Sequence, residues 1–304
     1  MRCQKGAEMI ERNTTKLRKL LKAKTFLHMP AVYDALGARL VEHAGFEAVY
    51  NGGYVAGGSR AVSEPLLTMT EQVTQASDAA AAVNIPMVVD AGAGFGEPLH
   101  TMRTVREFIR AGIAGVHIED QLFPKRAHYH TYQVHEIEPA EFAEKIRYAC
   151  RERDRVDPDF VIIARSDSCR EFGVEVAAER VNLGIAAGAD LGLLFPRDVD
   201  EAELAPKLCK APLVYVNARG TRDGRPVLSR QDLQKMGYAG IIEAQVMMLP
   251  AVDAQQKMLA ELRSTGNYTG MSNELCIQVR KDIEDRIGLE EFYRIEQETV
   301  ESRA

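Results

Sequence analysis

Eight short apolar runs recur along this chain of 304 residues, separated by longer stretches rich in Ala, Glu, Arg and Leu. Strands that are apolar throughout are typical of a parallel sheet buried on both faces, with helices connecting the strands. Eight such units make a (β/α)8 barrel, an α/β fold of ~250 residues. The alternative is an open doubly wound sheet, but eight regular units exceed its usual strand number. The predicted strands are Phe26–Met29, Glu47–Tyr50, Pro86–Asp90, Gly115–Glu119, Phe160–Arg165, Leu191–Phe195, Leu213–Asn217 and Gly240–Glu243.

Glycines mark the ends of the stretches between the strands. Gly45, Gly112 and Gly188 each follow an alanine just before a predicted strand, and Gly237 is placed similarly. A glycine just past the last turn is a common helix stop signal. The pattern predicts helices at Tyr33–Ala44, Thr70–Val83, His100–Ala111, Pro139–Arg153 and Val174–Ala187.

The residues outside the barrel are expected to be helical and to belong to the same domain, which would span residues 1–304. An N-terminal helix is predicted within residues 1–24, at Ile10–Lys22. At the other end, residues 265–304 contain two predicted helices, Asn273–Val279 and Ile283–Ile295, joined near Lys281. The extra length therefore indicates packing or oligomerisation segments, not a second domain.

Composition excludes several classes of protein. The formal net charge is −6 and no long basic run occurs, which argues against a nucleic-acid partner. No stretch approaches the ~20 apolar residues of a membrane span, and the N-terminus has no apolar signal-peptide core. The cysteines are scattered and odd in number, which indicates neither a disulfide framework nor a structural zinc site. A cytoplasmic location is expected.

Polar residues gather where the predicted strands end. They are Asn51, Asp90, Glu119–Asp120, Arg165–Asp167 and Asn217. Any one of them could be a helix cap or a turn residue. In a barrel, however, these strand ends converge at one mouth, where active sites lie. Five strand ends of this kind predict a site there.

Asp90 is followed by a glycine-rich loop that contains Gly92, Gly94 and Gly96. A strand-end carboxylate suits a hard cation such as Mg²⁺, and glycines let the backbone approach a ligand closely. A dinucleotide-binding loop is the alternative, but the spacing is GxGxG and not GxGxxG.

Three other candidates carry charge. Glu119 and Asp120 could bind a metal through water or hold a lysine. The loop from Lys125 to His130 has two cations and two histidines, which can neutralise a carboxylate and move protons, although a solvated charged loop is the alternative. Arg165 ends a buried strand and needs a partner. That partner is either a carboxylate or phosphonate ligand, or an internal acid such as Asp167 or Glu119.

Taken together, these motifs resemble the isocitrate lyase/phosphoenolpyruvate mutase superfamily in order and spacing over about residues 25 to 290. The motifs are Tyr33-Asp34-Ala35-Leu36, Val89-Asp90-Ala91, His117-Ile118-Glu119-Asp120-Gln121, Pro124-Lys125-Arg126 and Ile163-Ala164-Arg165-Ser166-Asp167. The resemblance implies a (β/α)8 barrel whose last helix is swapped between subunits, here within residues 265–304, in a homotetramer made of two helix-swapped dimers. It also implies Mg²⁺ and a small 2-oxo or 2-hydroxy carboxylate as substrate.

The resemblance also assigns roles by position. Asp90 would bind the metal directly and Glu119 through water, while Arg165 would bind the substrate carboxylate. Catalytic roles fall on Lys125, His128, Tyr129 and Arg165. Substrate-binding roles fall on Tyr50, Gly52, Gly53, Asn217 and Arg219, the first three lying in an oxyanion-binding segment.

Gly52 stands where the family usually has Ser or Thr, and four acidic or acid/base positions also depart from the family pattern. Gly92 stands in place of an aspartate near the metal, and Ala127 in place of the cysteine that serves the lyases as acid or base. Phe195 and Arg219 stand in place of glutamates. The resemblance therefore implies weaker Mg²⁺ binding, one apolar wall, added positive charge if Arg219 faces the mouth, and His128 or Tyr129 as the replacement proton donor.

The expected function is a Mg²⁺-dependent lyase that cleaves a C–C bond, or decarboxylates, through an enolate-like intermediate. One alternative is a diverged family member with altered chemistry, such as a C–P bond mutase or hydrolase or a biosynthetic enzyme. A non-catalytic binding protein that has lost the site is the other alternative.

Overall fold

The computed structural model describes residues 11–127, 131, 133–221 and 224–303. The chain forms two compact units, Met1–Met248 and Leu249–Ala304, and each is described by itself. Among the described residues, no helix has the length and apolar character that crossing a membrane requires.

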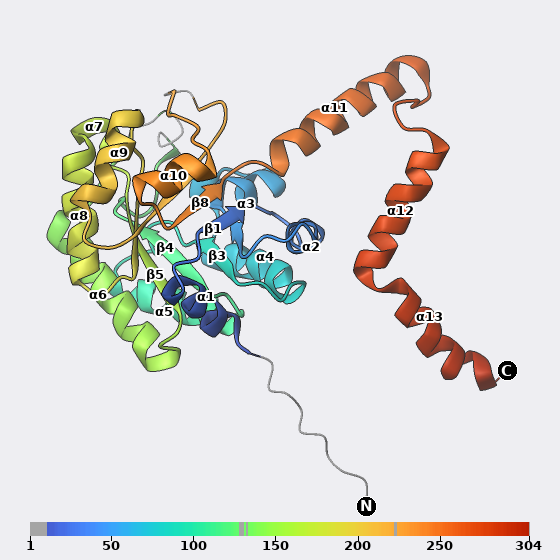
Figure 1. The fold of residues 1–304 in the computed structure, drawn as a ribbon, viewed down its shortest axis with the longest axis horizontal. Coiled ribbons are helices and arrows are strands. Elements are labelled where there is room, and N and C mark those ends of the chain that lie inside the picture. The colour runs from blue at the N-terminus through green and yellow to red at the C-terminus, as the bar shows by residue number, and fades with distance from the viewer. Residues whose placement is uncertain (1–10, 128–130, 132, 222–223, 304) are drawn as a thin grey trace, which may run out of the picture. The chain divides into compact units, whose positions relative to one another are not determined.

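The first unit is a barrel of eight parallel strands, as the sequence predicts (Figure 1). The strands pair in the order β1-β8-β7-β6-β5-β4-β3-β2, and a bridge between Ala31 and Tyr50 joins β1 to β2. The strands are β1 Leu27–Pro30, β2 Val49–Asn51, β3 Met87–Asp90, β4 Gly115–Glu119, β5 Val161–Ser166, β6 Leu191–Leu194, β7 Leu213–Asn217 and β8 Gly240–Glu243. Each lies within two residues of its predicted position at either end.

Helices surround this barrel. They are α1 Asn13–Lys22, α2 Ala35–His43, α3 Gly53–Ser59, α4 Met69–Ala81, α5 Pro98–Arg110, α6 Pro139–Val156, α7 Cys169–Phe172, α8 Val174–Ala186, α9 Val199–Leu208 and α10 Arg230–Met236, with a 3₁₀ turn, η1, at Glu64–Leu66. The predicted helices correspond to α1, α2, α4, α5, α6 and α8, and Gly237 follows α10 as its stop signal indicates, whereas no range was predicted for α3, α7 or α9. Gly188 follows α8 with φ +113°, a left-handed conformation that favours glycine, as the stop signal predicts.

Alternate residues of each strand point into the barrel, because successive side chains of a strand face opposite sides. Val88 of β3 and Ile163 of β5 belong to the interior cluster, together with Met29, Leu193 and Val214. Two residues farther along the same strands, the inward positions are Asp90 and Arg165. The inward-facing residues are therefore apolar along the middle of the barrel and polar at the carboxyl ends of the strands.

Helix α1 closes the opposite end of the barrel. Leu17 is 1% exposed and packs in the interior cluster. Arg18 holds both oxygens of Asp190, at 2.6 and 3.0 Å, and Thr14 donates to Asp157 at 2.9 Å. The helix predicted within residues 1–24 is thus part of the barrel.

The second unit is helical, with α11 Met248–Thr265, α12 Asn273–Ile287, α13 Leu289–Glu298 and a terminal 3₁₀ turn, η3, at Glu301–Arg303. The predicted break near Lys281 is wrong. Lys281 pairs with Asp285 one turn later at 2.9 Å, which supports a continuous helix, and the break falls at Gly288 with φ +77°. No residue of α12 or α13 is buried.

Candidate active site

A cavity of about 560 Å³ opens at the carboxyl ends of the strands. Of the residues assigned roles from sequence, five line it, namely Tyr50, Gly52, Gly53, Asp90 and Arg165. Glu119 and Lys125 are buried beside it, and the strand register places Asp90 next to His117 and Glu119 next to Arg165.

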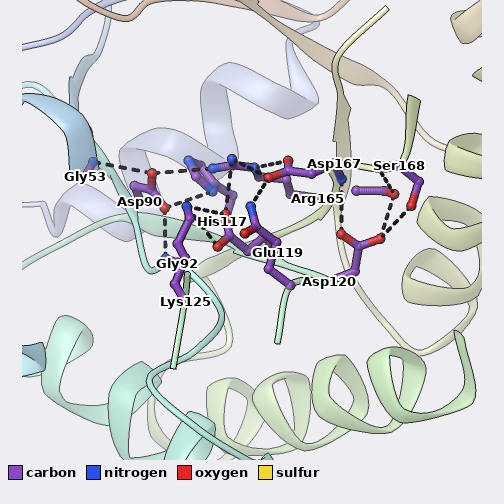
Figure 2. Close-up of polar contacts among 12 residues, drawn as sticks. Gly53, Asp90, Gly92, His117, Glu119, Asp120, Lys125, Arg165, Asp167 and Ser168 are labelled. Atoms are coloured by element: carbon purple, nitrogen blue, oxygen red, sulfur yellow. Dashed lines mark hydrogen bonds and ion pairs between the residues drawn. The ribbon is translucent and has the colours of Figure 1, made fainter. Parts of the chain in front are cut away.

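Arg165 is the centre of a buried charge network (Figure 2). Its Nε and Nη2 atoms donate to the two oxygens of Asp167 at 2.7 and 2.9 Å. Nη2 also lies 3.1 Å from Glu119, and Nη1 lies 3.4 Å from Asp90. The internal acids that the sequence offered as partners are therefore present, and the guanidinium group fixes three carboxylates around itself.

Lys125 adds a second buried cation. Its ammonium group lies 3.0 Å from Glu119 Oε1 and also pairs with Glu64. In the sequence, Glu64 belongs to η1 and follows no predicted strand, so no pattern in the sequence identifies it as a site residue. Glu64, Asp90, Glu119 and Asp167 thus lie around two buried cations, Lys125 and Arg165.

The pKa values of these acids follow from burial and from their neighbours. Burial opposes ionisation of Asp90, but His117 and Arg165 outweigh it, so the pKa of Asp90 lies well below its usual range. Burial raises the pKa of Glu119 to about 7, because Lys125 and Arg165 only partly offset desolvation. Asp90 is therefore the permanent anion of the site.

Asp120 points away from this network, because it follows inward-facing Glu119 by one residue. It accepts from Ser166 Oγ at 2.7 Å, from the Asp167 backbone at 3.1 Å and from Arg180 Nε at 2.6 Å. Asp120 therefore fixes the loop that carries Asp167 and does not share the metal-binding position suggested for the adjacent acids.

Tyr50, His117 and Asp90 form a line of polar groups on the cavity wall. The Tyr50 hydroxyl lies 2.6 Å from His117 Nε2, and His117 Nδ1 lies 3.5 Å from Asp90 Oδ1. A neutral imidazole has one N–H, and the anionic Asp90 favours that proton on Nδ1, so Nε2 accepts from Tyr50. His117 carries no role in the sequence prediction, although its position two residues before Glu119 places it on the inward face.

The two glycines after β2 leave room for neighbouring side chains. A Cβ atom on Gly53 would lie 2.7 Å from Glu64 Cγ, and one on Gly52 would lie 2.8 Å from the Tyr50 ring. The Gly53 amide donates to Asp90 at 3.3 Å. This segment brings backbone close to the metal-binding candidate, and its oxyanion-binding role remains a prediction.

The two residues assigned substrate contacts at and just after the end of β7 do not line the cavity. Asn217 bonds to both backbone groups of Leu228, at 2.9 and 3.1 Å, and so holds the following loop in place. Arg219 is exposed and does not line the cavity, whereas Arg225 of the same loop does. Arg225 stacks on Phe195, with Cζ 4.7 Å from the ring centroid.

The loop assigned as proton donor is only partly described. His128, Tyr129 and His130 lie outside the described residues, and Ala127 is exposed. The roles of His128 and Tyr129 stay predictions.

The donor set fits Mg²⁺ bound mainly by water and substrate. Among the described residues, no three His, Cys, Asp or Glu side chains form a metal centre by themselves. Mg²⁺, however, is commonly held by one or two carboxylates, with waters and substrate oxygens completing the octahedron. Asp90 and Glu119 supply two carboxylates around one guanidinium, and the network has more acids than cations, which a divalent cation would balance.

The chain is similar to proteins of known family and structure. The family described as phosphoenolpyruvate phosphomutase matches residues 17–263. The chain is 32% identical to 2,3-dimethylmalate lyase of Eubacterium barkeri, over 92% of this chain and 96% of that protein. It is similar to the structure of oxaloacetate acetylhydrolase bound to 3,3-difluorooxalacetate, with TM-score 0.86 and 29% identity over 94% and 96% of the two chains. It is also similar to phosphonopyruvate hydrolase in complex with oxalate and Mg²⁺, with TM-score 0.81 and 26% identity over 95% and 100%.

The protonation of His117 tests this electrostatic description. Burial lowers the pKa of His117 to about 4 from its usual 6.5, and Asp90 offsets only part of that shift. In divalent-free buffer, the His117 ring signal in ¹³C-histidine NMR should therefore titrate near pH 4, and His117→Gln should remove that signal. Between pH 4 and 6.5 the unfolded chain binds more protons here, so the stability contributed by this group falls as the pH falls through that window. A midpoint near 6.5 would contradict the buried, neutral imidazole.

Proposed function

Because the chain belongs to the phosphoenolpyruvate phosphomutase family, we propose that it is a Mg²⁺-dependent lyase of a small 2-oxo or 2-hydroxy carboxylic acid. The reaction would be C–C bond cleavage or decarboxylation through an enolate-like intermediate. One observation carries this proposal above the others: Asp90 and Glu119 face one guanidinium group, that of Arg165, at the mouth of a cavity large enough for such an acid.

Binding and orientation of the substrate fall to residues around that network. Asp90 would hold the metal directly and Glu119 through water, and the bound metal would stabilise negative charge on the enolate oxygen. Arg165, fixed by Asp167, would orient the substrate carboxylate. Burial of Lys125 against Glu64 and Glu119 excludes water from this side of the site.

Proton transfer can be served by Tyr50, which lines the cavity. Its hydroxyl group carries a proton and is held in place by the hydrogen bond to His117, so the phenol can give that proton to a carbanion-like carbon and regain one from solvent in the cavity. This assignment supplies an acid from the described residues where the lyase cysteine is replaced by Ala127. His128 and Tyr129 remain candidates for the same role.

A second candidate is C–P bond chemistry. It is favoured by the wall at Phe195, where the guanidinium groups of Arg165 and Arg225 lie against one aromatic ring, because planar guanidinium groups suit the oxygen atoms of a phosphonate.

Product formation with and without metal tests the main proposal. Pyruvate or oxo-acid release should occur with oxaloacetate, 2-methylisocitrate, 2,3-dimethylmalate or phosphonopyruvate, should vanish in EDTA and should return with Mg²⁺. The Asp90→Asn substitution should lower the Mg²⁺-dependent activity by more than the ~10- to 100-fold typical of an outer metal partner. Replacement of an exposed aspartate, Asp78→Asn, should change this activity little. Absence of turnover of all four acids by folded protein would contradict the proposal. Turnover of phosphonopyruvate alone would favour the second candidate.

Replacement of Tyr50 separates proton transfer from binding. Tyr50→Phe removes only the hydroxyl that bonds His117, so kcat should fall by ~10²- to 10⁴-fold while KM changes little. Tyr54→Phe is the matched control, because Tyr54 lines the same cavity and is 45% exposed. An unchanged kcat for Tyr50→Phe would show that another residue donates the proton.

We also propose that α12 and α13 exchange between subunits of a homotetramer built from two dimers. Neither helix has a buried residue, and both carry large exposed apolar side chains, including Leu275, Ile277, Ile287 and Phe292. Exposed apolar surface of this kind marks an interaction site. A chain truncated after Gly270 should therefore lose its oligomeric mass in light scattering while keeping the circular dichroism of the barrel, and an unchanged mass would contradict the exchange.

A further inference from the structure

A buried lysine of α6 contacts the glycine-rich loop that follows β3, residues 90–96. We infer that this residue, Lys145, is a positioning residue that holds the loop in the conformation that orients the Asp90 carboxylate, and so sets the affinity of the site for a divalent cation. Lys145 is not among the residues that line the cavity, so it acts through the loop. The inference rests on the proposed function only in taking Asp90 as the metal ligand.

The loop has a backbone that needs support. Gly92, Gly94 and Phe95 have φ angles of +51°, +78° and +56°, all in the left-handed region. Phe95 is not a glycine, so its conformation is costly. A backbone of this kind persists only where the surrounding structure holds it in place. Contacts from outside the loop therefore decide its shape.

Lys145 holds the loop next to the residue that contacts Asp90. Its Nζ atom donates to the carbonyl oxygen of Ala93 at 2.9 Å. The neighbouring Gly92 amide donates to Asp90 Oδ1 at 2.8 Å (Figure 2). Because these two contacts involve adjacent residues, a shift of Ala93 would also displace the Gly92 amide and the carboxylate that it orients.

Lys145 occupies a position where the helix pattern favours an apolar residue. It lies on the buried face of α6 with Phe142 and Ile146 and is 4% exposed. Burial lowers the pKa of its ammonium group, and Glu119 and Asp120 oppose part of that shift. Burying a charge is costly, and a neutral carbonyl compensates that charge less than a carboxylate does. A methionine would fill the same space without this cost, so the charge is better explained by the loop that it holds than by packing.

A purely electrostatic role for Lys145 predicts the opposite effect on metal binding. If the lysine served only as a counter-charge for Glu119, its removal would make the acids more attractive to a divalent cation, and the affinity would rise. If the lysine positions the loop, its removal would release the Ala93 carbonyl, and the affinity would fall. The sign of the change therefore separates the two roles.

Binding of Mn²⁺, which also suits carboxylate and water ligands, tests the inference without turnover. Electron paramagnetic resonance counts the free ion, and added Mg²⁺ competes for the site. Lys145→Met keeps the length of the side chain and removes its charge. This variant should weaken the binding of both ions by ~10- to 100-fold, the range for a group that orients a metal ligand.

Two control variants define the site and the specificity of the effect. Asp90→Asn should abolish Mn²⁺ binding, which would assign the ion to this site. Lys16→Met is the matched control, because Lys16 also donates to a backbone carbonyl, that of Asn84 at 2.5 Å, and is not among the cavity-lining residues. Lys16→Met should leave the affinity for both ions unchanged.

Hydrogen exchange keeps the test independent of a general loss of stability. In Lys145→Met the amides of Gly92 and Gly94, both hydrogen-bonded in the structure, should exchange faster, while those of β5 keep their wild-type rates. Equal acceleration in the loop and in β5 would indicate a role in folding alone and would overturn the inference. Lys145→Arg keeps a charged donor on a long side chain and should recover part of the metal affinity.

The outcomes also separate this inference from the proposed lyase activity. An unchanged or higher affinity of Lys145→Met for Mn²⁺, or failure of wild-type protein to bind Mn²⁺, would overturn the inference. Weaker Mn²⁺ binding by Lys145→Met, in a protein that turns over none of the test acids, would support the inference and count against the lyase. Mg²⁺-dependent turnover together with an unchanged metal affinity of Lys145→Met would support the lyase and overturn the inference.

Discussion

The charge of Arg165 is the constraint around which the mouth of the barrel is organised. A buried guanidinium group is costly unless carboxylates compensate it, and Asp90, Glu119 and Asp167 each come from the end of a different segment to do so. Once these acids surround one cation, they repel one another, and Lys125 relieves part of that repulsion. Two of these acids, Asp90 and Glu119, are the metal-binding candidates. Charge compensation and metal binding would therefore share groups, and a change at either acid would alter both.

The barrel and the strand-end acids could be predicted because both follow from short-range pattern. Side chains alternate along β3, β4 and β5, so Asp90, Glu119 and Arg165 face inward. The family resemblance adds a predicted role for each of the three. Glu64 could not be predicted this way, because it belongs to a short 3₁₀ turn that reaches the site only through the path of the chain after α3. Arg219 and Arg225 show the same limit: the loop conformation, fixed by Asn217 through Leu228, decides which arginine lines the cavity.

Closure of the amino end of the barrel by α1 has a consequence for the path of substrate and products. Within the part of the chain that the structure describes, Leu17 fills that end and the pairing of Arg18 with Asp190 anchors the helix, while the cavity opens at the carboxyl ends of the strands. A bond-cleaving enzyme makes two products from one substrate. Both products of the proposed cleavage would therefore depart on the side from which the substrate arrives.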